Sequence, residues 1–551
     1  MSLRLQPVPQ VPEETARVAR AALPHGNIYI KMRDEWGTIF TDEDFIVLFS
    51  SLGQSAIAPW QLALVTIMQY VENLSDRQAA DAVRSRIDWK YALSLELTDP
   101  GFDNTVLSEF RMRLVSGSAE QKVLDLILEK CREHKLIKAR GRQRTDSTHV
   151  LARVRAVNRL ECVGETMRHA LNSLAVVAPE WLQAHSRAEW VERYGRRVED
   201  YHLPTGKEER RTYAEAIGAD GEALLSAIYG QQAPAWLREV PAVETLRRVW
   251  VQQFYAEAGK LRWREEKEGI PPSAVFISSP YDGDARYAKK NTTSWVGYKV
   301  HLTETCEDDE PHLITNVETT AGPIADGDAT PRIHQALERK ALLPNLHIVD
   351  TGYVDAELRV TSKRDYEIEM LGPTRLDYKW QAKAAEGFDA GNFQIDWENK
   401  RATCPAGCNS LSWSPAIDNR INEVVKIKFS MKDCQPCASR AQCTRAKRRT
   451  ITVRRQDQYC ALQAARKREK TSEYRAEYRR RAGIEETLSQ GLRGYGLRRC
   501  RYLGEAKTHL QHVLTAAAIN FVRVYNWLTD RPRTKTRTST FSKLMGRPIS
   551  A

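Results

Sequence analysis

Short β-branched segments alternate with helical patterns in the middle of the chain, and this alternation limits the possible folds more than any other feature. A helical pattern at 328–342 separates two of the strand-like segments. Strands that alternate with helices indicate a sheet covered by helices, so we expect an α/β domain. The strand-like segments are 274–279, 295–305, 312–322, 346–352 and 366–372.

The same domain has a first strand far upstream. The run "RQRTDSTHVLARVR", 142–155, is short and β-branched, and a helical region from about 160 to 270 separates it from the other strands. Residues 1 to about 135 also show apolar residues at three- and four-residue steps, which predicts a helical bundle. Ser75 and Asp103 stand where helix N-caps belong.

The charge of the chain favours a partner rich in phosphate over an ordinary basic protein. The formal net charge is +12, and the run from Arg445 to Arg481 holds fourteen Lys or Arg against four acids. Such a run is usually a solvated helix face, but this excess favours a track for a phosphate backbone. No secretory leader or membrane span is evident, so we expect an intracellular protein whose ten Cys are not disulfide-bonded.

Two aspartates follow or lie within strand-like segments. Asp146 lies in "RTDSTHV", and Asp350 follows the apolar run of "LHIVDTGYVD", where Gly352 permits a tight turn. Either aspartate alone is more simply explained as a turn-forming residue whose carboxylate bonds to its own backbone. Together, on neighbouring strands, they could share Mg²⁺, which prefers carboxylate oxygens, water and substrate phosphate.

A two-metal site for phosphoryl transfer needs a third carboxylate, and the pair Glu485 and Glu486 offers it. With Ile484 at 0° and a step of about 100° per residue, Glu485 lies on the shoulder of the apolar face and Glu486 nearly opposite it. Tyr478 and Arg481 lie on the side of Glu485. Helical phase therefore selects Glu485 and predicts that Glu486 faces solvent.

Five cysteines between 404 and 443 predict a structural zinc site. Cys434 and Cys437 have the two-residue gap with which two thiolates grip one tetrahedral zinc. We favour Cys404 and Cys443 as the other ligands, with Cys404 and Cys408 as the competing choice. Reduced thiols without metal are the remaining alternative.

The "TDST" strand, "VDTGY" and the Tyr478-x2-Arg481-x3-Glu485 spacing together resemble bacterial insertion-sequence transposases of the DDE type. The helical N-terminus resembles that family's DNA-binding domain. The segment "SPYDGDARYAKKNTTSWVGYKVHLTET" resembles its second strand region, and "GLRRCRYLGEAKTHLQHVLTAAAINFVR" its C-terminal signature. The family's Lys seven residues after the Glu is Leu492 here, so Arg493 or Lys507 would supply that phosphate contact.

The resemblance implies a DNA transposase that binds terminal inverted repeats, hydrolyses phosphodiesters and joins the freed end to target DNA. It implies Asp146, Asp350 and Glu485 as ligands of two Mg²⁺ ions, for which Mn²⁺ may substitute. It also implies a homodimer or higher oligomer on DNA, in the bacterial cytoplasm and at the nucleoid. The DNA-binding residues it suggests are Tyr478, Arg481, Arg493, Arg498, Arg499 and Lys507. Tyr353 follows the second Asp. It is either the aromatic residue that the family has at this place or a residue that only packs in the core.

The fold that follows from the resemblance is multidomain, with a ribonuclease H-like mixed sheet of the α+β or α/β class interrupted by two insertions. The competing hypothesis is a non-catalytic, zinc-containing DNA-binding regulator or an inactive transposase derivative. The predicted segments are an N-terminal helical DNA-binding domain (1–138), the core (139–159 and 273–375), a helical insertion (160–272), a Cys-rich zinc-ribbon-like insertion (376–458), C-terminal core helices that carry the catalytic Glu (459–530) and a basic disordered tail (531–551).

Overall fold

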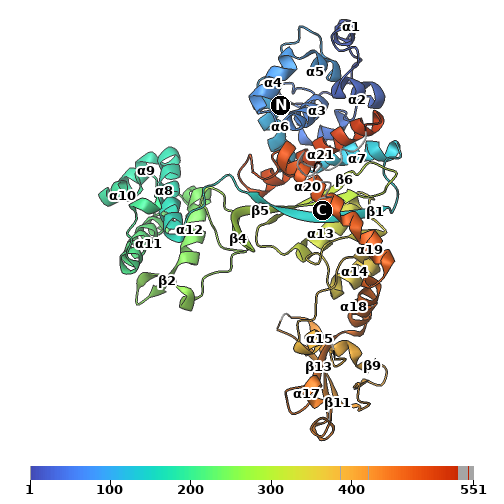
Figure 1. Ribbon diagram of the computed structural model, residues 1–551. Helices are drawn as coiled ribbons and strands as arrows, with labels where there is room; N and C mark the ends of the chain where they lie inside the picture. The colour runs from blue at the N-terminus through green and yellow to red at the C-terminus, as the bar shows by residue number, and fades with distance from the viewer. Residues whose placement is uncertain (1, 385, 420, 532–543, 545–551) are drawn as a thin grey trace.

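The computed structural model describes residues 2–384, 386–419, 421–531 and 544. Its centre is a six-stranded mixed sheet (Figure 1) in the order β4-β5-β1-β7-β8, with β6 also paired to β5. Strand β5 is antiparallel to β1, β4 and β6, whereas β1, β7 and β8 are parallel. The strands are β1 (Arg142–Leu151), β4 (Arg286–Lys290), β5 (Thr293–Thr305), β6 (Ile314–Ala321), β7 (Leu346–Ile348) and β8 (Glu369–Leu371).

Helices cover both faces of this sheet, which explains why β5 and β6 are buried almost without alternation. Figure 1 shows α20 (Ala482–Gly494) and α21 (Glu505–Leu528) on one side, and α13 (Asp326–Arg339) and α14 (Ala356–Tyr366) on the other. Helices α18 (Gln456–Glu469) and α19 (Ser472–Tyr478) continue along α14 toward α20. Three distant parts of the chain therefore build this domain. One supplies the first strand, one the later strands, and one the last helices, which pack on the sheet.

The N-terminal helices share one continuous hydrophobic core with the sheet, because α21 packs against both. Ser75 caps α4 through a capping box with Gln78, as predicted. The predicted cap at Asp103 is displaced: the structural N-cap of α6 is Asn104, and the Asp103 carboxylate accepts the N–H of Thr105. These helices are α1 (Glu13–Ala22), α2 (Ile28–Trp36), α3 (Pro59–Val71), α4 (Asp76–Ser85), α5 (Ile87–Ala92), α6 (Thr105–Ser116) and α7 (Lys122–Glu133).

The segment between β1 and β4 forms a helical body with a hydrophobic core of its own, and Figure 1 shows it projecting from the sheet. It also contains a β-hairpin, which the helical pattern did not predict. Its elements are α8 (Arg159–Val177), α9 (Pro179–His185), α10 (Ala188–Tyr194), α11 (Lys207–Tyr229), α12 (Pro241–Gln253), β2 (Phe254–Glu257) and β3 (Lys260–Trp263).

The Cys-rich segment forms two small sheets and short helices at the far end of the molecule in Figure 1. One sheet is β10-β9 and the other is β11-β12-β13. The elements are α15 (Trp380–Ala384), β9 (Gln394–Asp396), β10 (Arg401–Thr403), β11 (Ser410–Ile417), β12 (Glu423–Phe429), α16 (Met431–Cys434), α17 (Arg440–Cys443) and β13 (Thr450–Arg454).

The strand predicted at 274–279 is wrong, because this segment forms turns and irregular backbone. Side chains replace a strand ladder there: Gln252 accepts the N–H of Ile277 and donates to the carbonyl of Val275. The predicted tail 531–551 lies outside the described residues apart from Arg531 and Leu544. Among the helices described, none combines the length and the apolar character needed to cross a bilayer.

Candidate active site

Two of the predicted carboxylates follow from strand pairing. Asp146 lies in the middle of β1, and β7 runs parallel to β1 with Arg144 opposite Ile348. Strand β7 ends at Ile348 and Asp350 follows two residues later, so the parallel pairing brings the chain to Asp350 near Asp146, whose raised pKa includes a contribution from the Asp350 charge. The Oδ1 atom of Asp350 accepts the N–H of Gly352 at 2.8 Å, which holds the carboxylate at the turn after β7.

The third predicted carboxylate reaches the same place from α20, through an arginine. Arg481 donates from Nη2 to Oδ2 of Asp146 at 2.6 Å and from Nη1 to Oε1 of Glu485 at 2.7 Å. The Arg481 and Asp146 side chains are 17% and 14% exposed, whereas that of Glu485 is 60% exposed. Glu486 is also exposed, one step farther around the helix. One guanidinium thus bridges carboxylates that lie 339 positions apart in the chain.

Burial and the neighbouring negative charges both disfavour the ionised form of Asp146. Burial raises the pKa of Asp146 to about 6; Arg481 opposes this shift, and the charges of Asp350 and Glu485 add to it. Burial also raises the pKa of Tyr478, and the same three carboxylate charges contribute to that shift. The charges of Asp350 and Glu485 therefore act on both Asp146 and Tyr478, and such an accumulation of negative charge attracts a cation.

Two tyrosines near the site differ in their surroundings. Tyr478 lies at the end of α19 and stacks on Tyr474, with ring centroids 5.6 Å apart. Tyr353 is fully buried, and its hydroxyl contacts Nδ1 of His301 inside the core. The packing alternative for Tyr353 therefore accounts for its position.

A fourth acid, Asp326, which the sequence did not predict, lies near the site at the first position of α13. Its Oδ1 accepts from Nζ of Lys299 at 3.0 Å and lies 3.4 Å from Oγ of Ser147, the neighbour of Asp146. A Cβ on Gly352 would lie 3.0 Å from Oδ1 of Asp350 and 3.2 Å from Oδ2 of Asp326. Gly352 thus leaves room for two carboxylates. The available signal was an Asp at a helix start shortly after the end of a strand, β6.

The other predicted DNA-binding residues lie after Glu485. Arg493, Arg499 and Lys507 are exposed. Arg498 is half-buried and donates to the ring of His149, and burial lowers its pKa. The backbone beside it extends β1, because Leu151 donates its N–H to the carbonyl of Arg498 at 2.8 Å.

All five clustered cysteines line one pocket and none is disulfide-bonded. The N–H of Cys408 donates to Sγ of Cys404 at 3.3 Å, and the N–H of Arg449 donates to Sγ of Cys434 at 3.5 Å. Burial raises the pKa of Cys443, Arg449 opposes that shift, and the neighbouring sulfurs add to it. The sulfurs are thus close enough to influence one another's ionisation.

Over the residues that the structure describes, no three His, Cys, Asp or Glu side chains stand in a ligand arrangement around one point. The chemistry of both donor sets nevertheless fits a cation. At the carboxylate site the Arg481 guanidinium stands in for positive charge between Asp146 and Glu485. At the cysteine pocket, five sulfur donors line one small space, and backbone N–H groups point at two of them.

Two family models match the chain. The model described as "Transposase DDE domain" matches residues 403–525, and "Transposase domain (DUF772)" matches residues 17–113. Both matches support an insertion-sequence transposase of the DDE type. None of the curated proteins and none of the solved structures compared matches it. A transposase of this family acts on DNA.

The two matched ranges cover different parts of the chain. The DDE range contains the five clustered cysteines, Tyr478, Arg481 and Glu485. The DUF772 range covers most of the N-terminal helices. Neither range reaches Asp146 or Asp350, so the case for these two aspartates rests on the pairing of β1 with β7 and on the contribution of the Asp350 charge to the raised pKa of Asp146.

Proposed function

We propose that this transposase binds the ends of its element and uses Asp146, Asp350 and Glu485 for metal-dependent cleavage and strand transfer. The observation that carries the proposal is the single Arg481 guanidinium held between Asp146 and Glu485, next to the register position of Asp350. The mixed sheet agrees with a fold of the ribonuclease H-like class. Strand β1 pairs with the antiparallel strand β5 on one side and with the parallel strand β7, followed by β8, on the other.

The three carboxylates would hold Mg²⁺, or Mn²⁺ in its place. When bound, two such ions activate water or a 3′-hydroxyl for in-line attack and stabilise the leaving oxygen. The protein's own part is positioning. Asp350 is fixed by the N–H of Gly352, and Asp146 by its strand and by the N–H of Ser147 at 2.8 Å.

Arg481 has a second task when DNA arrives. Its guanidinium presents a rigid fork that matches phosphate as well as carboxylate. We infer that it passes from Asp146 and Glu485 to the phosphate beside the scissile bond, with Tyr478 alongside it. The transfer would leave both carboxylates free for the metal at the moment the substrate is in place. Arg493, Arg498, Arg499 and Lys507 would extend the phosphate contacts, and two copies of the protein would synapse two ends.

The cysteine pocket would hold a structural zinc ion. Cys434 and Cys437 supply one ligand pair, Cys404 and Cys443 the other, and Cys408 remains the alternative partner of Cys404. The gathering of all five sulfurs around one pocket supports this assignment. A site closed by four thiolates has no open position for chemistry, so its role is to stabilise the fold.

The test is cleavage and strand transfer on labelled element ends with Mg²⁺. We expect Asp350→Ala to lose activity by roughly 10³-fold, since it removes a ligand that stabilises charge in the transition state. Binding of the ends, measured by mobility shift, should stay within about 2-fold because the phosphate contacts remain.

Glu486→Ala is the matched control, because Glu486 is exposed beside Glu485 on the same helix. It should keep nearly the full rate. Full activity of Asp350→Ala would overturn the mechanism. Specific end binding by the wild-type protein without any Mg²⁺- or Mn²⁺-dependent cleavage would favour the regulator or inactive derivative.

A further inference from the structure

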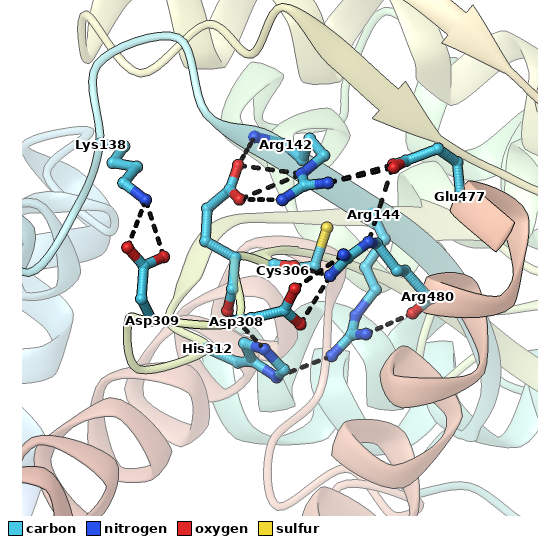
Figure 2. Close-up of polar contacts among 10 residues, drawn as sticks. Lys138, Arg142, Arg144, Cys306, Asp308, Asp309, His312, Glu477 and Arg480 are labelled. Atoms are coloured by element: carbon cyan, nitrogen blue, oxygen red, sulfur yellow. Dashed lines mark hydrogen bonds and ion pairs between the residues drawn. The ribbon is translucent and has the colours of Figure 1, made fainter. Parts of the chain in front are cut away.

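A buried charged network lies directly behind the three carboxylates. Arg144, two residues before Asp146 on β1, is 4% exposed, and Glu304 on β5 is fully buried. Arg144 donates from Nε to Oε1 of Glu304 at 2.8 Å. On its other side, Figure 2 shows the Arg144 guanidinium facing His312, where Nη2 lies 3.0 Å from Nδ1. The guanidinium is therefore held from two sides and has little freedom to move.

The other oxygen of Glu304 reaches the helix that carries Glu485. Oε2 accepts from Oγ1 of Thr487 at 2.6 Å and from Nη1 of Arg523 at 2.8 Å. Burial alone would raise the pKa of Glu304, but Arg523, Arg144 and Thr487 outweigh it and hold that pKa below its usual value. One ionised carboxylate thus joins β1 to α20 and α21.

Gly483 allows the helix to approach this network. A Cβ at Gly483 would lie 2.2 Å from Nη1 of Arg144, and the same nitrogen donates to the carbonyl of Arg480. A flexible arginine could step aside, but this one is already bonded to Glu304 and faces His312. The close contact therefore sets the distance between β1 and the first turn of α20, two residues before Glu485.

An outer set of ion pairs supports the same alignment, as Figure 2 shows. Arg142 pairs with Glu307 and also donates to Glu477 at 3.2 Å. Arg480 donates from both terminal nitrogens to the Asp308 carboxylate, each at 2.7 Å. The loop after β5 is thereby joined both to the start of β1 and to the turn that precedes α20.

Burying charged groups is costly, and a buried ion pair often adds little stability compared with apolar packing. Its more useful effect here is geometric, because several directional bonds converge on one side chain. We infer that Arg144 and Glu304 are positioning residues that fix the place of Glu485 relative to Asp146. The inference rests on the proposed function insofar as these two carboxylates bind the metal.

The experiment compares two substitutions in α20. Gly483→Ala adds a methyl group against Arg144, whereas Gly494→Ala, the matched control, meets no atom within 4 Å. Mn²⁺ binding to the DNA-free protein is measured by electron paramagnetic resonance, and end cleavage is measured in single turnovers with Mg²⁺ and with Mn²⁺. Thermal unfolding and end binding report whether the fold and the DNA contacts persist.

We expect Gly483→Ala to bind Mn²⁺ about 10-fold more weakly and to cleave at least 10-fold more slowly with Mg²⁺, since small misplacements of reacting groups can cost up to about 10² in rate. Cleavage should recover in part with Mn²⁺, because Mg²⁺ demands near-ideal octahedral geometry. End binding should change by less than about 2-fold. The Gly494→Ala variant should match the wild type throughout.

A rescue separates positioning from a general loss of structure. Arg144→Lys keeps the charge opposite Glu304 but removes the guanidinium that meets the new methyl group, so Gly483→Ala with Arg144→Lys should regain part of the Mg²⁺ rate. Independent, additive defects, or a wild-type rate and Mn²⁺ affinity in Gly483→Ala, would overturn the inference.

Failure of the proposed function has a different signature, namely a wild-type protein without metal-dependent cleavage. In that case the Mn²⁺ affinities still decide whether Arg144 and Glu304 position the two carboxylates.

Discussion

The carboxylate site and the cysteine pocket differ in how their residues are brought together. The carboxylates come from a first strand, a later parallel strand and a late helix, so they meet only when the whole sheet has formed. The cysteines all lie between 404 and 443, within one small body of short strands. One site depends on global folding and the other on a local fold.

This difference indicates which structural change would disrupt each site. A small shift between β1 and α20 changes the carboxylate geometry, and several buried ion pairs oppose such a shift. The cysteine pocket has only a small hydrophobic cluster around it, with six buried members. A body of that size needs additional stabilisation, which a metal supplies in many small domains. The predictions below test this contrast.

Among the variants that test this contrast, replacement of the bridging arginine should have the largest effect. Arg481→Gln removes the charge between Asp146 and Glu485, so we expect Mn²⁺ to bind the DNA-free protein about 10-fold more tightly, a gain of about 1.4 kcal/mol. Cleavage should nevertheless fall by roughly 10²-fold, because the phosphate loses its charged donor. Metal titration and single-turnover cleavage measure the two effects. Weaker metal binding by the variant would contradict the proposal that Arg481 supplies the positive charge of the metal in the DNA-free protein.

Loss of a cysteine ligand should act locally. Cys434→Ser, or removal of zinc by a chelator, should speed proteolysis within 376–458 by several tens of fold, because the open population of a metal-stabilised unit rises when the metal is lost. The sheet core should keep its unfolding temperature. Cys460→Ser is the control, since Cys460 is exposed outside the pocket. Simultaneous melting of the sheet would show that the two regions are not independent.

Crowding the two aspartates beside β7 should have an intermediate effect. Gly352→Ala places a methyl group within 3.2 Å of Asp350 and Asp326, so we expect roughly 10-fold slower cleavage from displaced carboxylates. Gly283→Ala, where a Cβ meets nothing within 4 Å, should cleave normally. An unchanged rate in Gly352→Ala would mean that the separation of these carboxylates does not matter for the reaction.

The smallest effect is expected at the exposed arginine of α20. Arg493→Ala should weaken end binding only a few-fold and lower the slope of log K against log salt by about 1, since one phosphate contact is lost. Binding isotherms at several salt concentrations measure this slope. The unfolding temperature should not change because the side chain is exposed. A steep loss of cleavage at constant binding would instead assign Arg493 to the chemistry.

Local patterns in the sequence were informative about single elements. The N-cap at Ser75 was predicted correctly, and Asp103 contributes a cap from one residue before the N-cap. The strand at 274–279 failed because its burial comes from packing against the helical body, with side chains replacing strand partners. Asp326 was missed because its closeness to Asp350 depends on where α13 lies against the sheet.

By itself the sequence carried the basic charge, the cysteine spacing and the alternation of strands with helices in the middle of the chain, and its helical phase predicted Glu485 rather than Glu486 as the third carboxylate, because these features can be read from neighbouring residues. Only the tertiary structure decided the parallel register that sets Asp350 beside Asp146, the Arg481 bridge and the buried pairing of Arg144 with Glu304. These contacts join residues far apart in the chain, and no local pattern encodes the pairing of one strand with another or the distance from a strand to a helix.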